Sequence, residues 1–180
     1  MENNVYNTRT LVRWLGLTCL LLAGMINVSS AQVNTNSGSG LNPTYPDLAS
    51  AVTALNAATI TSPVTITLTA NETAPAGGYS ITAQGSAANT IVIDGAGFTI
   101  TANGALTAGA LNDAIIKLVG ADFVTIQNFI MQENAANTTT AAATNNMTEW
   151  GVALLYATTT NGASSNTIQG NTISLNRTYQ

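Results

Sequence analysis

The sequence predicts an all-β fold, a solenoid of parallel strands that begins with one short capping helix. Three observations favour it. Charged residues make up only 7% of the 180 residues, too few for the solvent-exposed faces of an ordinary helical domain. The chain holds 29 Thr and 21 Asn, residue types that suit strands and tight turns. Finally, a group of three short apolar strands recurs about every 37 residues, which indicates a repeat architecture.

Residues 1–31 are predicted to be a secretory signal peptide. Arg9 and Arg13 precede a short apolar run, and small residues occupy the two positions that a signal peptidase reads before a cut after Ala31. A membrane anchor is the alternative, but the run of about 15 residues is short of the roughly 20 that span a bilayer. The mature chain is therefore expected to be secreted or attached to the cell surface, with no membrane span.

The charge of the mature chain limits its partners. Without residues 1–31 it keeps two basic and seven acidic residues, a net charge of −5, and no cysteine for a disulfide. This balance disfavours nucleic acid and anionic membranes, which bind clustered Lys and Arg. Neutral or weakly charged partners remain, and polysaccharides or cell-surface glycans are among them.

The mature chain is expected to begin with a linker and a helix. Residues 32–44 are rich in Asn, Ser and Gly and are predicted to be a flexible linker. Apolar residues then follow a helical spacing over 47–58, with Asp47 as the N-cap. We expect this helix to lie over the first strands, near Val64 and Ile66.

The period of the apolar residues changes to two from about residue 63. Apolar side chains alternate with Thr in 64–68, and a similar alternation marks the segments 91–94 and 98–101. Such alternation buries one face of a strand and leaves the other in solvent.

An internal repeat becomes visible when these strands are aligned. Thr125-Ile126-Gln127-Asn128 matches Thr167-Ile168-Gln169-Gly170, and another apolar residue follows each Ile after five positions. The same step joins Ile93 to Phe98. The repeat predicts two interior columns, Ile93 with Ile126 and Ile168, and Phe98 with Met131 and Ile173.

A tight turn is expected in each repeat, two residues after the first Ile. Gly95, Asn128 and Gly170 stand there, and these residue types tolerate a positive φ. A third strand is expected before each pair of strands that this turn joins. These strands are 79–81, 116–118 and 152–154.

Three strands per repeat describe one coil of a parallel β-helix, whereas a hairpin meander repeats every two strands. The Thr-Ile-Gln-Gly-Asn-Thr-Ile sequence at 167–173 and its partners at 91–98 and 125–131 resemble right-handed parallel β-helix proteins of the pectin-lyase-like superfamily. The resemblance covers residues 45–180 and implies a right-handed parallel β-helix with 47–58 as its capping helix. It implies no single function, because one fold hosts many activities.

The C-terminal end of this solenoid lacks a cap in the sequence. No amphipathic segment follows the last repeat, so we expect residue 180 to truncate a longer secreted protein. The alternative is a small protein whose end coil pairs in a dimer. In both cases the open coil is expected to self-associate.

No catalytic residue, cofactor or metal site is predicted. The sequence contains no His, which excludes a Ser-His-Asp triad and a His-ligated metal, and Lys117 and Arg177 are the only bases of the mature chain. Its acids do not form the pairs typical of calcium or glycosidase sites. Pectate lyases of the resembled superfamily use clustered acids with Arg or Lys, and its galacturonan hydrolases an Arg-x-Lys step; neither pattern occurs. Asp94 is expected to cap its own turn, with a calcium ligand as the alternative.

Lys117, Trp150 and Tyr156 are the candidate glycan-binding residues. Lys117 is in the middle of a strand and is expected to point outward, where it could meet an anionic sugar. The longest insertion, 134–149, directly precedes Trp150, and Tyr156 follows the next strand. Binding residues often lie beside such loops, and aromatic rings can stack on sugars. The alternatives are that Lys117 is only solvent-exposed and that Trp150 is buried, in phase with the apolar residues of the next strand.

Two functional classes therefore stay open. The favoured one is a non-catalytic β-helix module of a secreted or cell-surface bacterial protein, for adhesion or glycan binding. The other is the N-terminal part of a polysaccharide lyase or glycoside hydrolase whose catalytic coils lie beyond residue 180.

Overall fold

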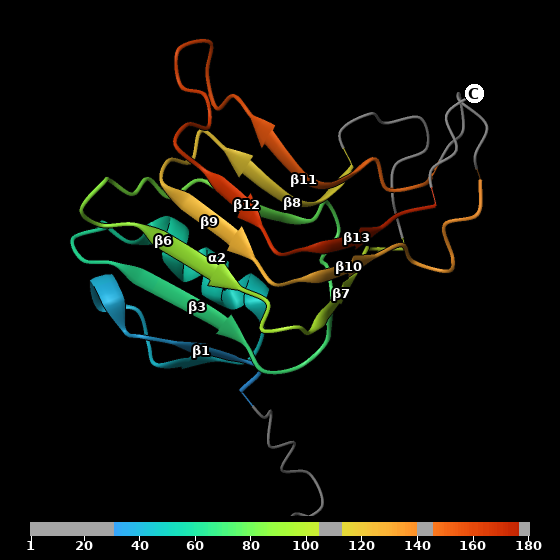
Figure 1. The fold of residues 1–180 in the computed structure, drawn as a ribbon, viewed down its shortest axis with the longest axis horizontal. Coiled ribbons are helices and arrows are strands. Elements are labelled where there is room, and N and C mark those ends of the chain that lie inside the picture. The colour runs from blue at the N-terminus through green and yellow to red at the C-terminus, as the bar shows by residue number, and fades with distance from the viewer. Residues whose placement is uncertain (1–30, 105–112, 140–145, 177–180) are drawn as a thin grey trace, which may run out of the picture. The chain divides into compact units, whose positions relative to one another are not determined.

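The computed structural model describes residues 31–104, 113–139 and 146–176, which belong to one compact unit, Ala31–Gln180 (Figure 1). The predicted signal peptide lies outside the described residues, apart from Ala31. Within the described ranges the unit is predominantly β, with one α-helix, and no helix is long and apolar enough to span a membrane.

The strands form three sheets. Sheet A contains β1 (Val33–Thr35), β2 (Thr44–Tyr45), β3 (Val64–Leu68), β6 (Ile91–Asp94), β9 (Val124–Gln127) and β12 (Thr167–Gln169). Sheet B contains β4 (Glu72–Thr73), β7 (Thr99–Thr101), β10 (Ile130–Gln132) and β13 (Thr172–Ser174). Sheet C contains β5 (Tyr79–Ile81), β8 (Ala114–Val119) and β11 (Trp150–Leu155). The helices are η1 (Gly38–Gly40), of the 3-10 type, and α2 (Leu48–Ala57).

The chain visits these sheets in a fixed order. From β3 onward it passes through sheets A, B and C three times and then enters A and B again with β12 and β13. Every strand pair formed among β3 to β13 is parallel. The prediction of parallel sheets with one helix is confirmed. We call one passage through the three sheets a round.

One of the two predicted interior columns is confirmed and the other is wrong at one position. Ile93 pairs in register with Ile126, and Ile126 with Ile168. In the second column Met131 pairs with Ile173 as expected, but its partner in the earlier round is Ile100 rather than Phe98. The step of five residues misplaced Phe98 because the turn between β6 and β7 is two residues longer than the later turns.

The same longer turn changes the backbone conformation. Asn128 and Gly170 have φ of 59° and 63°, as predicted. Gly95 does not have a positive φ, and Ala96 and Gly97 take the left-handed conformation in its place, with φ of 50° and 82°. Two residues rather than one therefore reverse the chain in this turn.

The predicted flexible linker at 32–44 is instead ordered. Its strand β1 pairs antiparallel with β3 and β2, and Val33 is fully buried. The Asn36 side chain accepts from Thr65 N and donates to Pro63 O. A polar sequence is held here because its partner strand supplies the hydrogen bonds, and composition alone does not reveal that partner.

Helix α2 matches the predicted capping helix. Asp47 accepts a hydrogen bond from Ser50 N at 2.7 Å, the expected N-cap. The helix buries Leu48, Ala51, Val52 and Leu55 in the core. It lies against β5 and β2, and its buried side chains share one core cluster with Val64 and Ile66 of β3.

Asparagine side chains connect successive rounds at the turns. Asn171 Nδ2 donates to Ile126 O at 2.9 Å, and its Oδ1 accepts from Phe129 N at 2.9 Å. An amide side chain offers one acceptor and two donors, so it replaces a main-chain pair where a turn interrupts the ladder. Asn36, Asn56 and Asn166 each make the same two hydrogen bonds, in which Nδ2 donates to a carbonyl oxygen and Oδ1 accepts from a main-chain N–H.

Candidate functional site

Lys117 lies on the outer face of sheet C. Its strand β8 places it between Ser80 of β5 and Ala153 of β11, and it is half-buried. Asp113 lies four residues earlier; burial raises the pKa of its carboxyl above the ordinary value, and the Lys117 charge opposes this in part. The expectation that Lys117 points outward agrees with this register.

Trp150 and Tyr156 are not brought to the side of Lys117. Trp150 pairs with Ala114 and alternates with Ala153, the strand neighbour of Lys117, so it belongs to the other face of sheet C. It is 47% exposed although it is in phase with Val152. Tyr156 follows β11 and is 73% exposed. The three candidates thus form no common site.

The loop between β10 and β11 is held by a buried carboxylate. Glu133 accepts hydrogen bonds from Asn137 Nδ2 at 2.7 Å and from Thr148 Oγ1 and N at 2.8 and 2.9 Å. Asn137 Oδ1 and Asp113 Oδ2 are buried, and neither has a hydrogen-bond partner among the described residues. In the described part of the chain no group of three or more His, Cys, Asp or Glu could hold a metal ion. Residues 140–145 of this loop lie outside the described ranges.

Asp94 caps its own turn. Its carboxylate accepts from Ala96 N and Gln127 Nε2, each at 2.8 Å, and from Asn128 Nδ2 at 3.1 Å. These hydrogen bonds outweigh burial and lower the pKa of the carboxyl below its ordinary value. All three donors belong to the turn or to the next round, so the role is structural.

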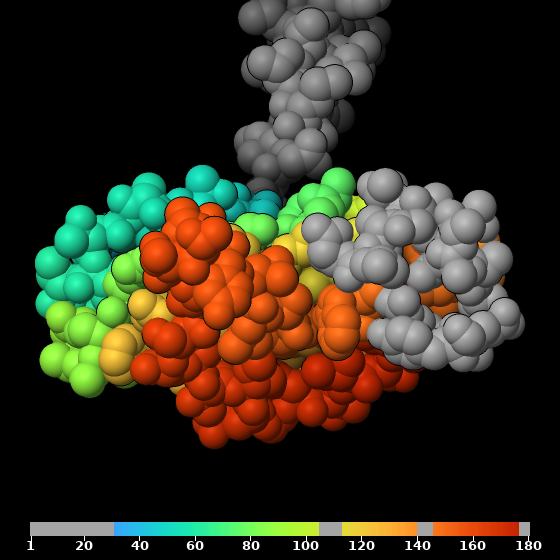
Figure 2. All heavy atoms as spheres, turned by 90° about the horizontal axis from the view of Figure 1, so that it is seen from above, coloured from blue at the N-terminus to red at the C-terminus, as the bar shows by residue number. Residues whose placement is uncertain are grey.

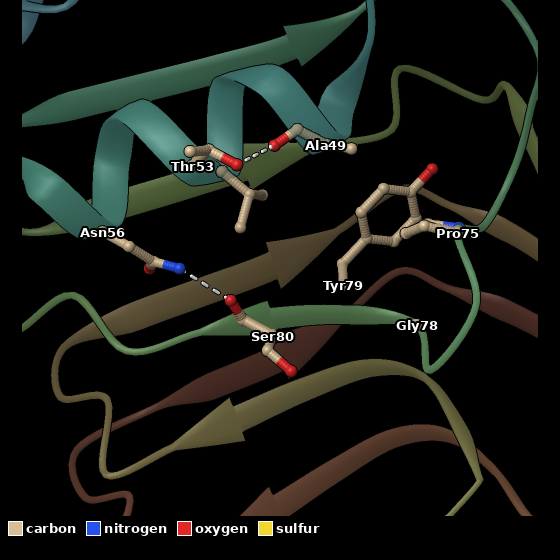
Figure 3. A pocket seen from close by; sticks show the side chains of 8 residues that line it. Ala49, Thr53, Asn56, Pro75, Gly78, Tyr79 and Ser80 are labelled. Carbon is tan, nitrogen blue, oxygen red and sulfur yellow. Dashed lines mark hydrogen bonds between the residues drawn. The ribbon is translucent and has the colours of Figure 1, made fainter.

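A groove of about 220 Å³ lies between α2 and β5 (Figure 3). The Asn56, Thr53 and Tyr79 side chains that line it already make hydrogen bonds within the protein. Asn56 Nδ2 donates to Ser80 O and its Oδ1 accepts from Thr82 N, both at 2.8 Å. Thr53 Oγ1 donates to Ala49 O at 2.8 Å. The groove is therefore the seam that joins the helix to the edge of sheet C rather than an open binding site.

The outer face of sheet A carries a regular array of polar side chains. Parallel register aligns Gln127 with Asp94 and Gln169, and Thr125 with Thr167. Gln169 Nε2 donates to Gln127 Oε1 at 3.0 Å and Gln127 Nε2 to Asp94 Oδ2 at 2.8 Å. We call this the Thr/Gln face. Its members are Thr65, Thr67, Val92, Asp94, Thr125, Gln127, Thr167 and Gln169.

The spacing of this array across the sheet is regular, because neighbouring strands lie about 4.8 Å apart. In Figure 1 its strands β3, β6, β9 and β12 run side by side. The signal that reveals it in the sequence is the Thr or Gln beside the central Ile of β3, β9 and β12, whereas Val92 and Asp94 take these positions beside Ile93 in β6. The face offers hydroxyl and amide groups at fixed spacing, which suits hydrogen bonding to a repeating partner.

Exposed apolar side chains gather on the last strand of each sheet, β11, β12 and β13, and on the residue after β11. Five of the six large exposed hydrophobic residues of the described chain belong to β11, β12, β13 or the residue after β11. We call them the apolar end: Trp150, Leu154, Tyr156, Ile168 and Ile173. Figure 2 looks onto this part of the unit, where the orange to red residues of the last round form the surface.

Comparison with protein-family models, with curated proteins and with solved structures finds no match to this chain. Its function is therefore inferred from these surfaces and their chemistry.

Proposed function

We propose that this chain is a right-handed parallel β-helix similar to the pectin-lyase-like superfamily, and that it is a non-catalytic glycan-binding module of a secreted or cell-surface protein. The cyclic order of sheets A, B and C with parallel pairing supports the β-helix. The predicted signal peptide at 1–31 supports secretion.

The Thr/Gln face is the observation that carries the binding function. It presents side-chain hydroxyl and amide groups on the parallel strands β3, β9 and β12, in register with Val92 and Asp94 of β6 between them. A polysaccharide is itself a repeating chain of hydroxyl groups, so several weak hydrogen bonds can form along one extended ligand. Multiple contacts on a fixed spacing offset the low net energy of each single hydrogen bond.

Charge favours a neutral glycan over an anionic one. The mature chain carries a net charge of −5, and Asp94 is the charged member of the face. The pKa of Asp94 lies below its ordinary value, so this carboxylate is ionised at neutral pH. An anionic polymer would meet repulsion there, which weakens association at low salt.

The test is a binding titration of residues 31–180 with neutral and anionic polysaccharides. Thr125→Val with Thr167→Val removes two hydroxyl groups while it keeps the side-chain shape. Each lost hydrogen bond is worth about 1 kcal/mol, so the affinity for the bound neutral glycan should fall about tenfold or more. The matched control, Thr99→Val with Thr172→Val, removes two outward hydroxyl groups of sheet B, one on each side of Ile130, and should bind normally.

Two results would overturn this proposal. Equal affinity of both double variants would show that the Thr/Gln face does not bind. A loss of binding in Lys117→Ala or Trp150→Ala, with the Thr125/Thr167 variant unaffected, would instead move the site to sheet C or to the apolar end.

A further inference from the structure

We propose that the ligand of the Thr/Gln face is a neutral β-1,4-linked glycan that lies across the strands of sheet A, with one sugar over each strand. This inference rests on the proposed glycan-binding function and adds the linkage and the direction of the ligand. Two rows of side chains that cross the strands carry it, and we call them the hydroxyl row and the amide row.

The hydroxyl row consists of β-branched side chains. Parallel register aligns its members, which are Thr65, Val92, Thr125 and Thr167. β-branched side chains are stiff at χ1, so their methyl and hydroxyl groups keep a fixed direction. A sugar ring has C–H groups on its faces and hydroxyl groups at its edges. The row can therefore contact both parts of a sugar with little loss of side-chain entropy.

The amide row has a fixed polarity. Its members in register are Thr67, Asp94, Gln127 and Gln169. Gln169 Nε2 donates to Gln127 Oε1 at 3.0 Å, and Gln127 Nε2 donates to Asp94 Oδ2 at 2.8 Å. An ionised carboxylate only accepts hydrogen bonds, so Asp94 determines which way both amides point. Each amide nitrogen carries two N–H groups and uses one in this ladder, which leaves the other for a ligand.

Both rows are accessible and run in the same direction. Their members are all half-buried or exposed, and in Figure 1 the four strands run side by side with α2 on their inner side. On one strand the two rows are two residues apart, roughly 6.6 Å, whereas neighbouring strands repeat each row about every 4.8 Å. A single strand thus offers one side chain from each row. An extended ligand gains further contacts of the same kind only by crossing the strands.

The straight course of the rows selects the linkage. A β-1,4-linked chain of glucose is a flat extended ribbon with hydroxyl groups along both edges, and each sugar advances it by nearly the strand spacing. Such a ribbon can keep hydroxyl groups over the amide row and C–H groups over the methyl groups of the hydroxyl row at successive strands. An α-1,4-linked chain of the same sugar coils, so its hydroxyl groups leave the rows after one or two sugars.

The outer face of sheet B lacks this pair of rows. Ile130 separates Thr99 from Thr172 in one of its rows. In the other row Gln132 Nε2 donates to Thr101 Oγ1 at 2.9 Å, so no ladder of amides forms. Sheet B therefore provides an outward glutamine in a different arrangement, which serves as the control.

The experiment titrates isotope-labelled residues 31–180 with cello-oligosaccharides and malto-oligosaccharides of two to four glucose units. This segment is a compact unit with its own core, so it is tested alone. The two series contain the same sugar and differ only in linkage. Each added glucose of the cello series should raise the affinity at least about fivefold, because it adds at least one hydrogen bond. Cellotetraose should bind at least about tenfold more tightly than maltotetraose.

The side-chain amides locate the ligand directly. The nuclear magnetic resonance signals of the Gln127 and Gln169 side-chain amides should shift as cellotetraose binds, and that of Gln132 should not. Gln127→Leu with Gln169→Leu removes the ladder and should lower the affinity for cellotetraose at least about tenfold. Gln132→Leu on sheet B is the matched control and should bind normally. Circular dichroism checks that each variant is folded, and the linkage comparison and the amide shifts need no variant.

The possible failures are distinguishable. Equal affinity for cellotetraose and maltotetraose would refute the linkage and leave the glycan-binding function standing. An affinity that does not rise with chain length would refute the direction across the strands. Shifts confined to residues outside sheet A would refute the two rows as the site. Binding to none of the neutral and anionic polysaccharides would defeat the proposed function, and this inference with it.

Discussion

At the scale of single residues, one glycine is required because a neighbouring residue lies too close for a Cβ, and not because of its own φ. Gly95 has no positive φ, yet a Cβ built there would stand 2.5 Å from Phe129 Cδ1 and 2.7 Å from Phe129 Cα. Because Phe129 is buried and part of that contact is main chain, the neighbour cannot move aside. The turn of one round therefore rests directly on the turn of the next.

Gly95→Ala should lower the free energy of unfolding by about 1–3 kcal/mol, the usual cost of overpacking a core. Gly77→Ala is the control, because Gly77 has a φ of 80° with nothing within 4 Å of the added Cβ. It should cost only the left-handed strain of about 1 kcal/mol. Urea denaturation measures both, and an equal loss in the two variants would argue against the close contact.

At the scale of elements, α2 is attached to the sheets by both apolar and polar contacts. Leu55 is fully buried. At the N-terminus of α2, the Glu72 carboxylate accepts from Leu48 N at 3.0 Å and from Tyr79 OH at 3.0 Å. A carboxylate at this position also interacts favourably with the helix dipole. The helix thus closes the first round instead of resting on it loosely.

Leu55→Asp should lower the free energy of unfolding by several kcal/mol, because it buries an unpaired charge in this seam. Thr53→Asp on the exposed side of the same helix is the control and should have a small effect. Thermal unfolding compares the two. An unchanged melting temperature in Leu55→Asp would remove α2 from its capping role.

The pH dependence of stability follows from two carboxyl groups, and one of them, Glu72, accepts a hydrogen bond from the N-terminus of α2. Burial raises the pKa of Glu72 and of Asp113 above their ordinary values, so these groups bind protons more tightly in the folded state. Their contribution to stability is complete below the unfolded pKa and is lost as pH rises through the folded pKa. Stability should therefore increase as pH is lowered from neutral, through about 5, toward the ordinary carboxyl pKa values near about 4.

Glu72→Gln should reduce that increase, because glutamine does not titrate. Asp94 acts in the opposite direction: its pKa is lowered, so its contribution is present above the ordinary Asp value and is lost as pH falls through the folded value. Asp94→Asn should leave the change between about pH 7 and about pH 5 nearly intact. Denaturant unfolding at the two pH values measures this, and equal curves for wild type and Glu72→Gln would refute the assignment.

At the scale of the whole molecule, three surfaces of the described unit differ in chemistry. Sheet A presents polar ladders that include Asp94, sheet C presents Lys117 between Ser80 and Ala153, and the strands β11, β12 and β13 carry exposed apolar side chains. The scattered acids of the described chain are engaged in turns and loops, as Asp94 and Glu133 show. This distribution is the basis of the binding function that we propose.

Residues 31–180 should release no unsaturated products or reducing ends from polygalacturonate or neutral polysaccharides, with or without calcium. A β-eliminating lyase needs a base beside a neutralised carboxylate, and the two basic residues of this segment, Lys117 and Arg177, are far apart in sequence. Incubation followed by product detection measures this. Turnover that disappears in Lys117→Ala would make the segment an enzyme.

The sequence by itself determined the features that depend on local chemistry. Alternating Ile and Thr specified which face of each strand is buried, so the column of Ile93, Ile126 and Ile168 was predictable. The spacing of apolar residues and the N-cap Asp47 predicted α2. The residue types Asn128 and Gly170 predicted the left-handed backbone conformation at their turns. In each case the signal lies within a few residues of the feature, since periodicity and backbone preference act locally.

The tertiary structure alone decided what depends on partners distant in the chain. Residues 33–35 form a strand because β3 pairs with them, and Phe98 leaves the interior column because the turn before it is two residues longer. Strand register also separated Lys117 from Trp150 and joined Asp94, Gln127 and Gln169 into one ladder. Register and turn length are set by packing between rounds, which involves residues tens of positions apart in the sequence. No local sequence pattern therefore predicts them.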